Sequence, residues 1–445
     1  MVTNAIVAVA TPPGVGGLGV VRVSGPGVAR IARAILGRNL KPRLASLCSF
    51  RDGSGDVIDQ GIAIFFRGPH SFTGEDVLEL QGHGGPVVMD LLLARCLELG
   101  ARLARPGEFT ERAYLNGKLD LVQAEATADL IESSTSLAAR LAMRSLQGLF
   151  SRRIRVLVDD LVRLRTAIEA TLDFPEDIID PQSLVRFRFE LERLVDSAQQ
   201  TLSQARQGER VRDGLTVVIA GRPNVGKSSL LNALLEVDAA IVTPIPGTTR
   251  DLLRCELQID GLPVKLIDTA GLREAVEPVE QEGVRRARGQ LELADLILWV
   301  YDHRQGVEAA EISGLPPNVP MTLVQNKIDL DLHVPGDILP DGIVPLRLSA
   351  LTGLGIKELR QHIKSRVHIE GLGEGSFVAR RRHLDALQRG LICLNAARSV
   401  LEVGLGLEVI ALELLEAQHA FGEITGEFTP DDLLGRIFAS FCIGK

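Results

Sequence analysis

The chain has 445 residues, which is enough for two to four domains of roughly 100–200 residues each. Hydrophobic residues make up 45% and charged residues 24%, and this balance excludes disordered, collagen-like and coiled-coil chains. Acidic residues outnumber basic ones by 57 to 49, which excludes a globally basic nucleic-acid coat but leaves a local basic patch open. No secretory leader pattern occurs, and no apolar run approaches the ~18 residues that span a bilayer. The five cysteines form no Cys-x-x-Cys pair. We therefore expect a cytoplasmic protein without a membrane segment, a zinc ribbon or a disulfide framework.

Residues 1–118 are predicted to form a mixed α/β domain. Apolar or alternating runs predict strands over Ala5–Ala10, Gly19–Val23, Gly61–Phe66 and Val77–Leu80, and a helix over Pro86–Leu99. The glycines of Gly14–Gly19 formally match the dinucleotide fingerprint Gly-x-Gly-x-x-Gly, but a predicted strand follows them where that fold needs a helix. No dinucleotide site is therefore predicted. His83 has no partner at metal-ligand spacing, and we expect it to be a loop or packing residue.

From Leu119 the apolar residues recur at helical spacing, and residues 119–210 are predicted to be the first part of a helical domain. The apolar face of its long helix comprises Phe150, Ile154, Leu157, Leu161, Leu164, Ile168 and Leu172. Alternation of strands, loops and helices over residues 211–372 predicts a second α/β domain, and Gly371–Ser376 is a plausible linker. Residues 373–445 are helical again and end in a Cys-Ile-Gly-Lys tail. We expect the second α/β domain to be inserted into one helical domain, because insertion is tolerated where the two ends of the insert lie close together.

The strongest motif is the glycine-rich segment Gly221–Ser228, which follows an apolar strand, Leu215–Ala220, and opens a helix, Ser229–Leu235. In such a phosphate loop the backbone N–H groups surround the phosphates. The ammonium of Lys227 neutralises phosphate oxygens, and the hydroxyl of Ser228 binds Mg²⁺.

Three further motifs follow in the order found in Ras-like GTPases. Asp268–Gly271 follows a predicted strand over Val264–Ile267, Asn326–Asp329 follows one over Met321–Val324, and Ser349–Ala350 follows one over Val344–Leu348. A carboxylate at Asp329 accepts both guanine N–H groups, whereas adenine would leave it unpaired. The sequence therefore predicts a GTPase domain. Its predicted GTP-binding residues are Asn224, Val225, Gly226, Lys227, Ser228, Ser229, Thr243, Pro244, Ile245, Pro246, Gly247, Thr248, Thr249, Asp268, Thr269, Ala270, Gly271, Asn326, Lys327, Asp329, Ser349 and Ala350.

The catalytic apparatus is predicted to differ from that of Ras. Leu272 occupies the position at which Ras has the glutamine that orients the attacking water, so another group must position the water and another must supply positive charge. Thr243–Asp251 is the candidate switch segment. Asn224 is a candidate ligand of a monovalent cation, and a role in stabilising its own loop is the alternative.

Two features outside these motifs each allow two interpretations. The basic run Ala379–His383 is interpreted as a solvated face, with contact to a nucleic-acid backbone as the alternative. Cys442 is interpreted as a small buried apolar residue, because a nucleophile would need a depressed pKa.

Taken as a whole, the chain resembles the MnmE/TrmE family of tRNA uridine-5-carboxymethylaminomethyl modification GTPases. Besides the GTPase motifs, the resemblance rests on Ala10–Gly14, Ser71–Gly85, Arg105–Phe109, Asn116–Asp120 and Phe441–Lys445. It implies a multidomain α/β plus α fold: an N-terminal folate-binding α/β domain that also drives homodimerisation, a helical domain, and an inserted Ras-like P-loop GTPase domain.

The resemblance also implies the roles of individual residues. Arg22, Glu79, Lys118 and Lys445 would bind 5-formyl- or 5,10-methylene-tetrahydrofolate. Asn224, Thr243, Ile245 and Thr248 would bind K⁺, and Ser228 and Thr249 would bind Mg²⁺. Catalysis would use Lys227, Glu280, which replaces the missing glutamine, and Cys442 as a candidate thiol.

The same resemblance implies partners. They are a second copy of the chain, a partner that carries FAD and uses NADH (GidA or MnmG) in a heterotetramer, and the tRNA whose wobble uridine, at position 34, is modified at C5 with a folate one-carbon unit. Two alternatives stay open: a GTP-switched RNA-binding or ribosome-assembly factor, similar to Era or Der, and a folate aminomethyltransferase with a regulatory GTPase insert. The residues alone establish only a GTPase with two accessory domains.

Overall fold

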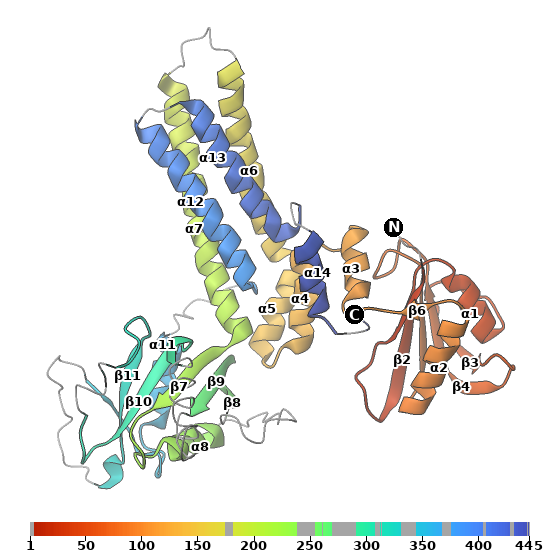
Figure 1. The fold of residues 1–445 in the computed structure, drawn as a ribbon, viewed down its shortest axis with the longest axis horizontal. Coiled ribbons are helices and arrows are strands. Elements are labelled where there is room, and N and C mark those ends of the chain that lie inside the picture. The colour runs from red at the N-terminus through yellow and green to blue at the C-terminus, as the bar shows by residue number, and fades with distance from the viewer. Residues whose placement is uncertain are drawn as a thin grey trace, which may run out of the picture. The chain divides into compact units, whose positions relative to one another are not determined.

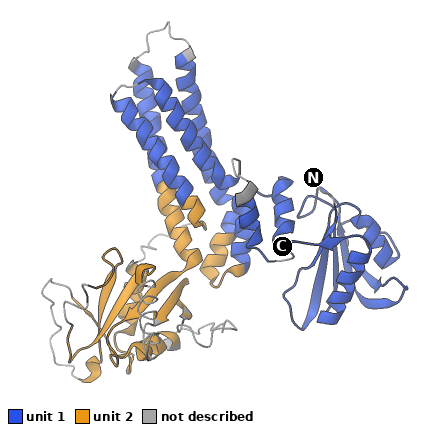
Figure 2. Ribbon diagram, in the orientation of Figure 1, with its two compact units in different colours: residues 1–131, 143–199, 385–445 blue, residues 132–142, 200–384 orange. Residues whose placement is uncertain are grey.

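The structure is a computed structural model. It describes residues 4–173, 181–237, 254–259, 261–268, 291–307, 312, 314–330, 344–366, 375–403, 406–427, 431–442 and 444. The chain divides into two compact units (Figure 2). Unit 1 comprises Met1–Ile131, Met143–Gln199 and Asp385–Lys445, and unit 2 comprises Glu132–Ala142 and Gln200–Leu384. The four domains predicted from the sequence were defined by residue patterns, whereas the two units are defined by contacts. The boundaries of the four domains therefore stay a prediction.

Unit 1 contains a sheet built almost entirely from antiparallel pairs, with strand order β3-β4-β5-β2-β1-β6 (Figure 1). Its strands are β1 (Ile6–Val9), β2 (Gly16–Ser24), β3 (Ser46–Arg51), β4 (Val57–Phe66), β5 (Val77–Gly84) and β6 (Arg102–Leu103), and only the pair β1–β6 is parallel. The glycines after Pro13 lead into β2 and no helix follows them, which agrees with the rejection of a dinucleotide site.

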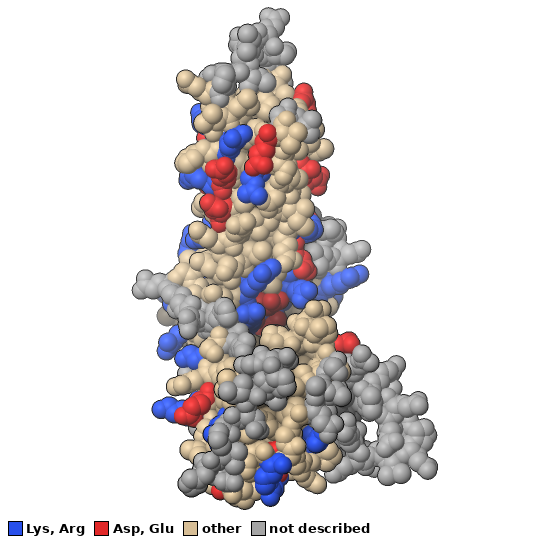
Figure 3. All heavy atoms as spheres, turned by 90° about the vertical axis from the view of Figure 1, so that its left-hand side faces the viewer, with Lys and Arg blue, Asp and Glu red and all other residues tan. Residues whose placement is uncertain are grey.

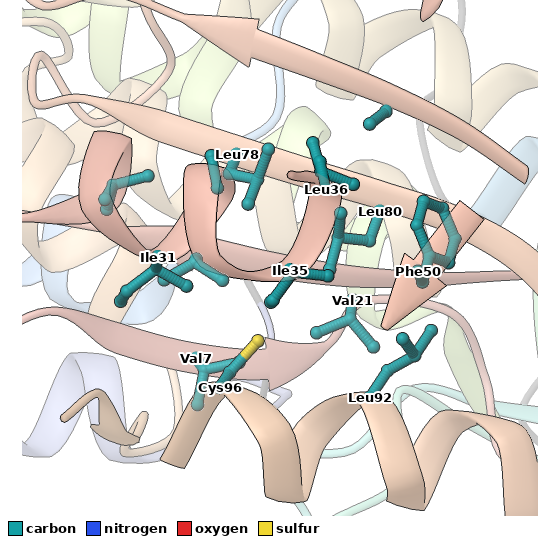
Figure 4. Packing of buried hydrophobic residues seen from close by; sticks show 14 of the residues in the cluster. Val7, Val21, Ile31, Ile35, Leu36, Phe50, Leu78, Leu80, Leu92 and Cys96 are labelled. Atoms are coloured by element: carbon teal, nitrogen blue, oxygen red, sulfur yellow. The ribbon is translucent and has the colours of Figure 1, made fainter. Parts of the chain in front are cut away.

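One face of this sheet carries the core of the N-terminal domain (Figure 4). Helices α1 (Val28–Leu36) and α2 (Pro86–Glu98) pack there against strand residues that include Val21, Leu78 and Leu80. Because side chains alternate along a strand, the neighbours Arg22 and Glu79 belong to the opposite face. Helix α2 was predicted. Helix α1 and strand β3 were not, because α1 spans only nine residues and β3 only six, with serines interrupting its apolar pattern.

The rest of unit 1 is helical, and four of the helices below, α4, α5, α7 and α12, have residues that belong to unit 2. The helices are α3 (Glu108–Leu115), α4 (Leu121–Glu132), α5 (Ser136–Leu146), α6 (Leu149–Asp173), α7 (Pro181–Asp213), α12 (Arg381–Val403), α13 (Leu407–Thr425) and α14 (Asp431–Ala439). The predicted apolar face of α6 is confirmed, because its residues from Phe150 to Ile168 are buried and Leu172 is half-buried. Helices α6 and α13 lie side by side (Figure 1), although the sheet of unit 2 separates them in the sequence.

Helix α7 continues to Asp213, directly before the second sheet. One expectation about a charged segment needs correction. In the basic run Ala379–His383, which was expected to be a solvated face, only Arg381 is exposed. His383 is buried, and its Nδ1 accepts the backbone N–H of Arg380 at 2.9 Å. On the visible part of the face in Figure 3, basic and acidic side chains are interspersed rather than gathered by sign. None of the described helices is long and apolar enough to cross a bilayer.

Unit 2 contains the sheet expected for a nucleotide-binding α/β domain, with strand order β12-β11-β10-β7-β9-β8. Its elements are β7 (Leu215–Ala220), α8 (Lys227–Val237), β8 (Arg254–Ile259), β9 (Leu262–Asp268), β10 (Leu296–Asp302), β11 (Met321–Asn326), the 3-10 turn η2 (Ile328–Leu330), β12 (Leu346–Arg347) and α11 (Ile356–Arg366). All pairs are parallel except β8–β9. The carboxyl ends of parallel strands share one edge, which is where such sheets bind ligands.

Candidate functional site

The phosphate loop joins strand β7 to helix α8, as predicted. Gly221 and Gly226 adopt positive φ angles of 144° and 96°, and a Cβ at Gly221 would lie 2.1 Å from the carbonyl oxygen of Val300. Only glycine fits this approach of the loop to strand β10. Lys227 is buried, and its Nζ donates to the carbonyl oxygens of Gly221 at 2.9 Å and Arg222 at 2.8 Å. The ammonium therefore lies inside the loop, beside the amino end of a helix, where anions bind favourably.

Asn326 connects three of the predicted motifs. Its Nδ2 donates to the carbonyl oxygen of Val225 at 2.9 Å, and its Oδ1 accepts the backbone N–H groups of Lys327 at 2.8 Å and Ala350 at 3.0 Å. The side chain is buried. The phosphate loop, the segment after β11 and the segment after β12 are thus brought together by one amide. This matches the arrangement that the motif order predicts.

Lys327 makes a second connection between these segments. Its Nζ donates to the carbonyl oxygen of Asn224 at 2.7 Å and to Oδ2 of Asp302 at 3.0 Å. Both Asn224 and Lys327 have left-handed backbones, with φ of 62° and 64°, which non-glycine residues rarely adopt. Asp302 was not predicted from the sequence. Its one signal there is its position at the end of the apolar strand β10, and in the structure it pairs in register with Asn326.

Asp329 carries an unsatisfied acceptor beside this loop. Its Oδ1 is buried and has no hydrogen-bond partner among the described residues. A buried carboxylate oxygen without donors costs free energy, so such an atom fits a site for a ligand that brings N–H groups. Guanine brings them from N1 and N2, and the residues present therefore fit a guanine nucleotide.

In unit 1, two of the predicted folate residues form a pair. Arg22 on β2 and Glu79 on β5 are register partners, and Oε1 of Glu79 accepts Nε of Arg22 at 3.0 Å and Nη2 at 2.8 Å. The guanidinium also lies 5.9 Å from the ring centroid of Phe109. Both side chains keep partial exposure. The third predicted residue, Lys118, donates from its Nζ to the carbonyl oxygen of Pro69 at 3.1 Å, and the described contacts include none between Lys118 and this pair.

The C-terminal tail reaches the same pair. Arg22 Nη1 lies 3.5 Å from the carbonyl oxygen of Gly444, and the carbonyl of Cys442 accepts the N–H of Gly107 at 3.3 Å. Phe441 is buried against α4 and α14. Cys442 itself is exposed, which corrects the expectation of a buried apolar residue.

Comparison with known proteins finds similar sequences over almost the whole length of the chain. A family model described as the MnmE helical domain matches residues 121–442, and one described as the GTP-binding protein TrmE N-terminus matches residues 5–118. The tRNA modification GTPase MnmE of Histophilus somni (strain 129Pt) is 51% identical over 452 residues, with 100% of both chains covered. The protein of that name from Methylococcus capsulatus is 54% identical over 444 residues, with 99% of each covered.

This chain belongs to the MnmE family of tRNA modification GTPases. The prediction of a GTP hydrolase in tRNA modification is thereby confirmed. Among solved structures, Era of Aquifex aeolicus bound to GDP·AlF4⁻ is 29% identical over 40% of this chain and 66% of that chain, at a TM-score of 0.29.

Part of the predicted MnmE-type site lies outside the described residues. This applies to the K⁺, Mg²⁺ and switch residues Thr243, Pro244, Ile245, Pro246, Gly247, Thr248 and Thr249, to Thr269, Ala270, Gly271 and Leu272, to Glu280 and to Lys445. Asp268 is described as the last residue of β9, in register with Ile219.

A network of ion pairs around Glu108, in the same unit as the Arg22–Glu79 pair, was not predicted. Glu108, on α3, is buried and accepts both Nη groups of Arg102, the N–H of Arg105 and Nη2 of Arg112. Burial alone would raise the pKa of Glu108, but the hydrogen bonds from Arg102, Arg105 and Arg112 hold it at about 2. Arg112 also donates to Glu75. In this MnmE-family chain the network ties α3 to the sheet face that bears Arg22.

His83 departs from its predicted role. It lies in strand β5 rather than in a loop, and its side chain is 75% exposed. Its Nδ1 lies 2.8 Å from Oδ1 of Asp59, and its backbone N–H donates to Oδ2 at 2.7 Å. These contacts hold the pKa of Asp59 below its usual value although burial opposes that shift.

Proposed function

We propose that this chain binds and hydrolyses GTP to GDP and phosphate, in a K⁺-dependent manner, and that hydrolysis serves the modification of C5 of the wobble uridine of certain tRNAs. The observation that carries the proposal is the loop after β11. Its Asn326 and Lys327 are bonded to the phosphate loop, and its Asp329 presents a buried carboxylate oxygen without a donor. Guanine recognition and phosphate binding are thus joined in one framework.

The described residues support a defined role in binding. Lys227 would hold the β- and γ-phosphates from inside the loop, together with backbone N–H groups at the start of α8. Ser228 and Thr249 would hold Mg²⁺, and Asn224, Thr243, Ile245 and Thr248 would hold K⁺, which supplies the positive charge of an arginine finger. In hydrolysis, water attacks the γ-phosphorus, the bond to the β-phosphate oxygen breaks, and GDP leaves. Glu280 would orient that water in place of a glutamine.

The nucleotide site can be tested with the purified chain. We expect a fluorescent GDP analogue to be displaced by GDP and not by ADP at equal concentration. We also expect faster GTP turnover in K⁺ than in Na⁺ buffer. Displacement by both nucleotides would contradict guanine recognition, and equal turnover in both buffers would contradict the role of K⁺.

The N-terminal domain is proposed to bind the tetrahydrofolate cofactor at the Arg22–Glu79 pair. The half-buried charged pair, the neighbouring ring of Phe109 and the tail backbone at Gly444 support this assignment. Lys118 and Lys445 complete the proposed set, and the exposed Cys442 is the proposed thiol. A pteridine offers a flat ring and polar edges that suit an aromatic neighbour and paired charges. The bound folate would supply the one-carbon unit.

The proposed assembly is a homodimer that works in the cytoplasm with an FAD- and NADH-dependent partner of the GidA/MnmG type, as a heterotetramer, on tRNA. The first experiment is mass spectrometry of nucleosides in bulk tRNA from cells without the protein and cells complemented with it. Loss of carboxymethylaminomethyl uridines and their return on complementation is the expected result. Unchanged tRNA would contradict the proposal and favour a ribosome-assembly factor, whereas one-carbon transfer without tRNA would favour an aminomethyltransferase.

A further inference from the structure

We propose that Asp302 is a positioning residue of the nucleotide site, because its carboxylate fixes the ammonium of Lys327 between the guanine-binding loop and the phosphate loop. The inference rests on the GTP site proposed above and deepens it. No motif of the sequence includes Asp302, which ends strand β10 and faces Asn326 across the β10–β11 pair.

The geometry gives the Lys327 ammonium two acceptors on two different elements. Its Nζ lies 2.7 Å from the carbonyl oxygen of Asn224 in the phosphate loop and 3.0 Å from Oδ2 of Asp302. A lysine side chain has many rotamers, and a single carbonyl would leave it free to swing away. The second, charged acceptor restricts the ammonium to the point where it also bonds to Asn224.

The carboxylate of Asp302 is suited to this task because it is itself immobile. The side chain is 1% exposed, so water competes little for its oxygens. Arg304 holds it from the other side: Nε lies 3.2 Å from Oδ1 and Nη2 lies 3.0 Å from Oδ2, and the Arg304 N–H donates to Oδ1 at 3.1 Å. His303 lies nearby, with Nδ1 3.6 Å from Oδ1, and makes no hydrogen bond to it.

The two residues that this contact joins are also the two with unusual backbones in the site. Asn224 and Lys327 both have left-handed φ angles, and Arg43 is the one other non-glycine among the described residues that does. Such backbones cost free energy and persist where surrounding contacts enforce them. The Lys327–Asn224 bond is one such contact, and Asp302 stabilises it. Loss of the carboxylate would therefore loosen both loops at once, at the end that binds the base and at the end that binds phosphate.

The direct test is Asp302→Asn, which keeps the size of the side chain and removes its charge. We expect the dissociation constant for a fluorescent GDP analogue to rise about tenfold, which corresponds to the loss of one hydrogen bond to a charged group. The matched control is Asp295→Asn, the same substitution at an exposed carboxylate that lies just before the opposite end of strand β10, where its Oδ2 accepts the backbone N–H of Thr216 at 2.9 Å. We expect affinity within about twofold of wild type for this variant.

A double-mutant cycle separates positioning from a merely structural role. In a Lys327→Met background, Asp302→Asn should change the dissociation constant less than about twofold, because its partner is already gone. An undiminished tenfold effect in that background would overturn the inference, and so would equal losses in Asp302→Asn and Asp295→Asn. Competition of GDP against ADP on the wild-type chain tests the proposed function separately. If guanine preference is seen there and Asp302→Asn binds normally, the GTP site stands and only the role of Asp302 is lost.

Discussion

Arg22 in the N-terminal sheet and Gly444 near the end of the chain meet across 422 residues of sequence, where Nη1 of Arg22 lies 3.5 Å from the carbonyl oxygen of Gly444. The approach depends on the absence of a side chain, since a Cβ at Gly444 would lie 2.6 Å from the carbonyl oxygen of Val9. Gly444 also has a φ of 97°, which disfavours other residues. Gly444 thus lies against the face of β2 at which we propose that folate binds, and the exposed Cys442 precedes Gly444 by two residues.

A substitution at Gly444 should therefore impair the N-terminal site selectively. Gly444→Ala is expected to displace the tail from Val9 and to lower tRNA modification several-fold, while GTP turnover stays unchanged. The measurements are the modified uridines in tRNA from complemented cells and phosphate release by the purified variant. The control is Gly435→Ala in α14, where a Cβ meets nothing within 4 Å and alanine favours the helix. Wild-type levels of modified uridine in cells that carry Gly444→Ala would show that the close contact between Gly444 and Val9 is not required.

The charged pair gives a second prediction about the same site. Arg22→Met keeps the aliphatic stem and removes the guanidinium, so Glu79 loses the two hydrogen bonds that orient it. We expect the affinity for 5-formyltetrahydrofolate to fall about tenfold or more, as measured by isothermal titration calorimetry. Arg51→Met on strand β3 is the control, because that arginine bonds only to the backbone of its own turn among the described contacts. Equal folate affinity in the two variants would remove Arg22 from the site.

The features that could be predicted from the sequence are those determined by residues close together in the chain. The strand–glycine loop–helix order around Lys227 and the apolar face of α6 follow from residues close together in the chain. Asp302 was missed because its role depends on the register of β10 with β11, which no local spacing reveals. Arg22 and Glu79 were assigned to the folate site only by family resemblance, and their pairing with each other and the contact of Arg22 with the tail required the folded chain.

Guanine selection by Asp329 gives a prediction that concerns specificity. Asp329→Asn replaces one acceptor oxygen with an N–H₂ donor, which opposes the N2 amino group of guanine and suits the C2 carbonyl of xanthine. We expect GTP affinity to fall about a hundredfold and XTP to become the better ligand. The measurement is displacement of a fluorescent nucleotide by GTP and by XTP. Wild-type selectivity in the variant would mean that the unsatisfied oxygen of Asp329 faces something other than the base.

The Glu108 network predicts a dependence of stability on pH. The pKa of Glu108 is about 2 in the folded chain, against an ordinary value of 4.5. Because the folded pKa is depressed, the network's contribution is complete above about pH 5, on the order of 3 kcal/mol, and is lost progressively as the pH falls from about 5 to about 2. Glu108→Gln cannot bind the proton. Its melting temperature should therefore lie well below that of wild type at pH 7 and at pH 5, and the gap should narrow at pH 4 and again at pH 3.

Differential scanning calorimetry of the full chain measures this gap. Glu98→Gln is the matched control, because Glu98 is 61% exposed and, among the described residues, forms an ion pair with Arg95 alone, one turn earlier in α2. It should melt within about a degree of wild type at every pH. A gap for Glu108→Gln that stayed constant from pH 7 to pH 3 would indicate that its cost comes from lost packing or neutral hydrogen bonds. The arginines around Glu108 would then not be what keeps it ionised, and α3 would be held to the Arg22 face by its apolar contacts through Phe109.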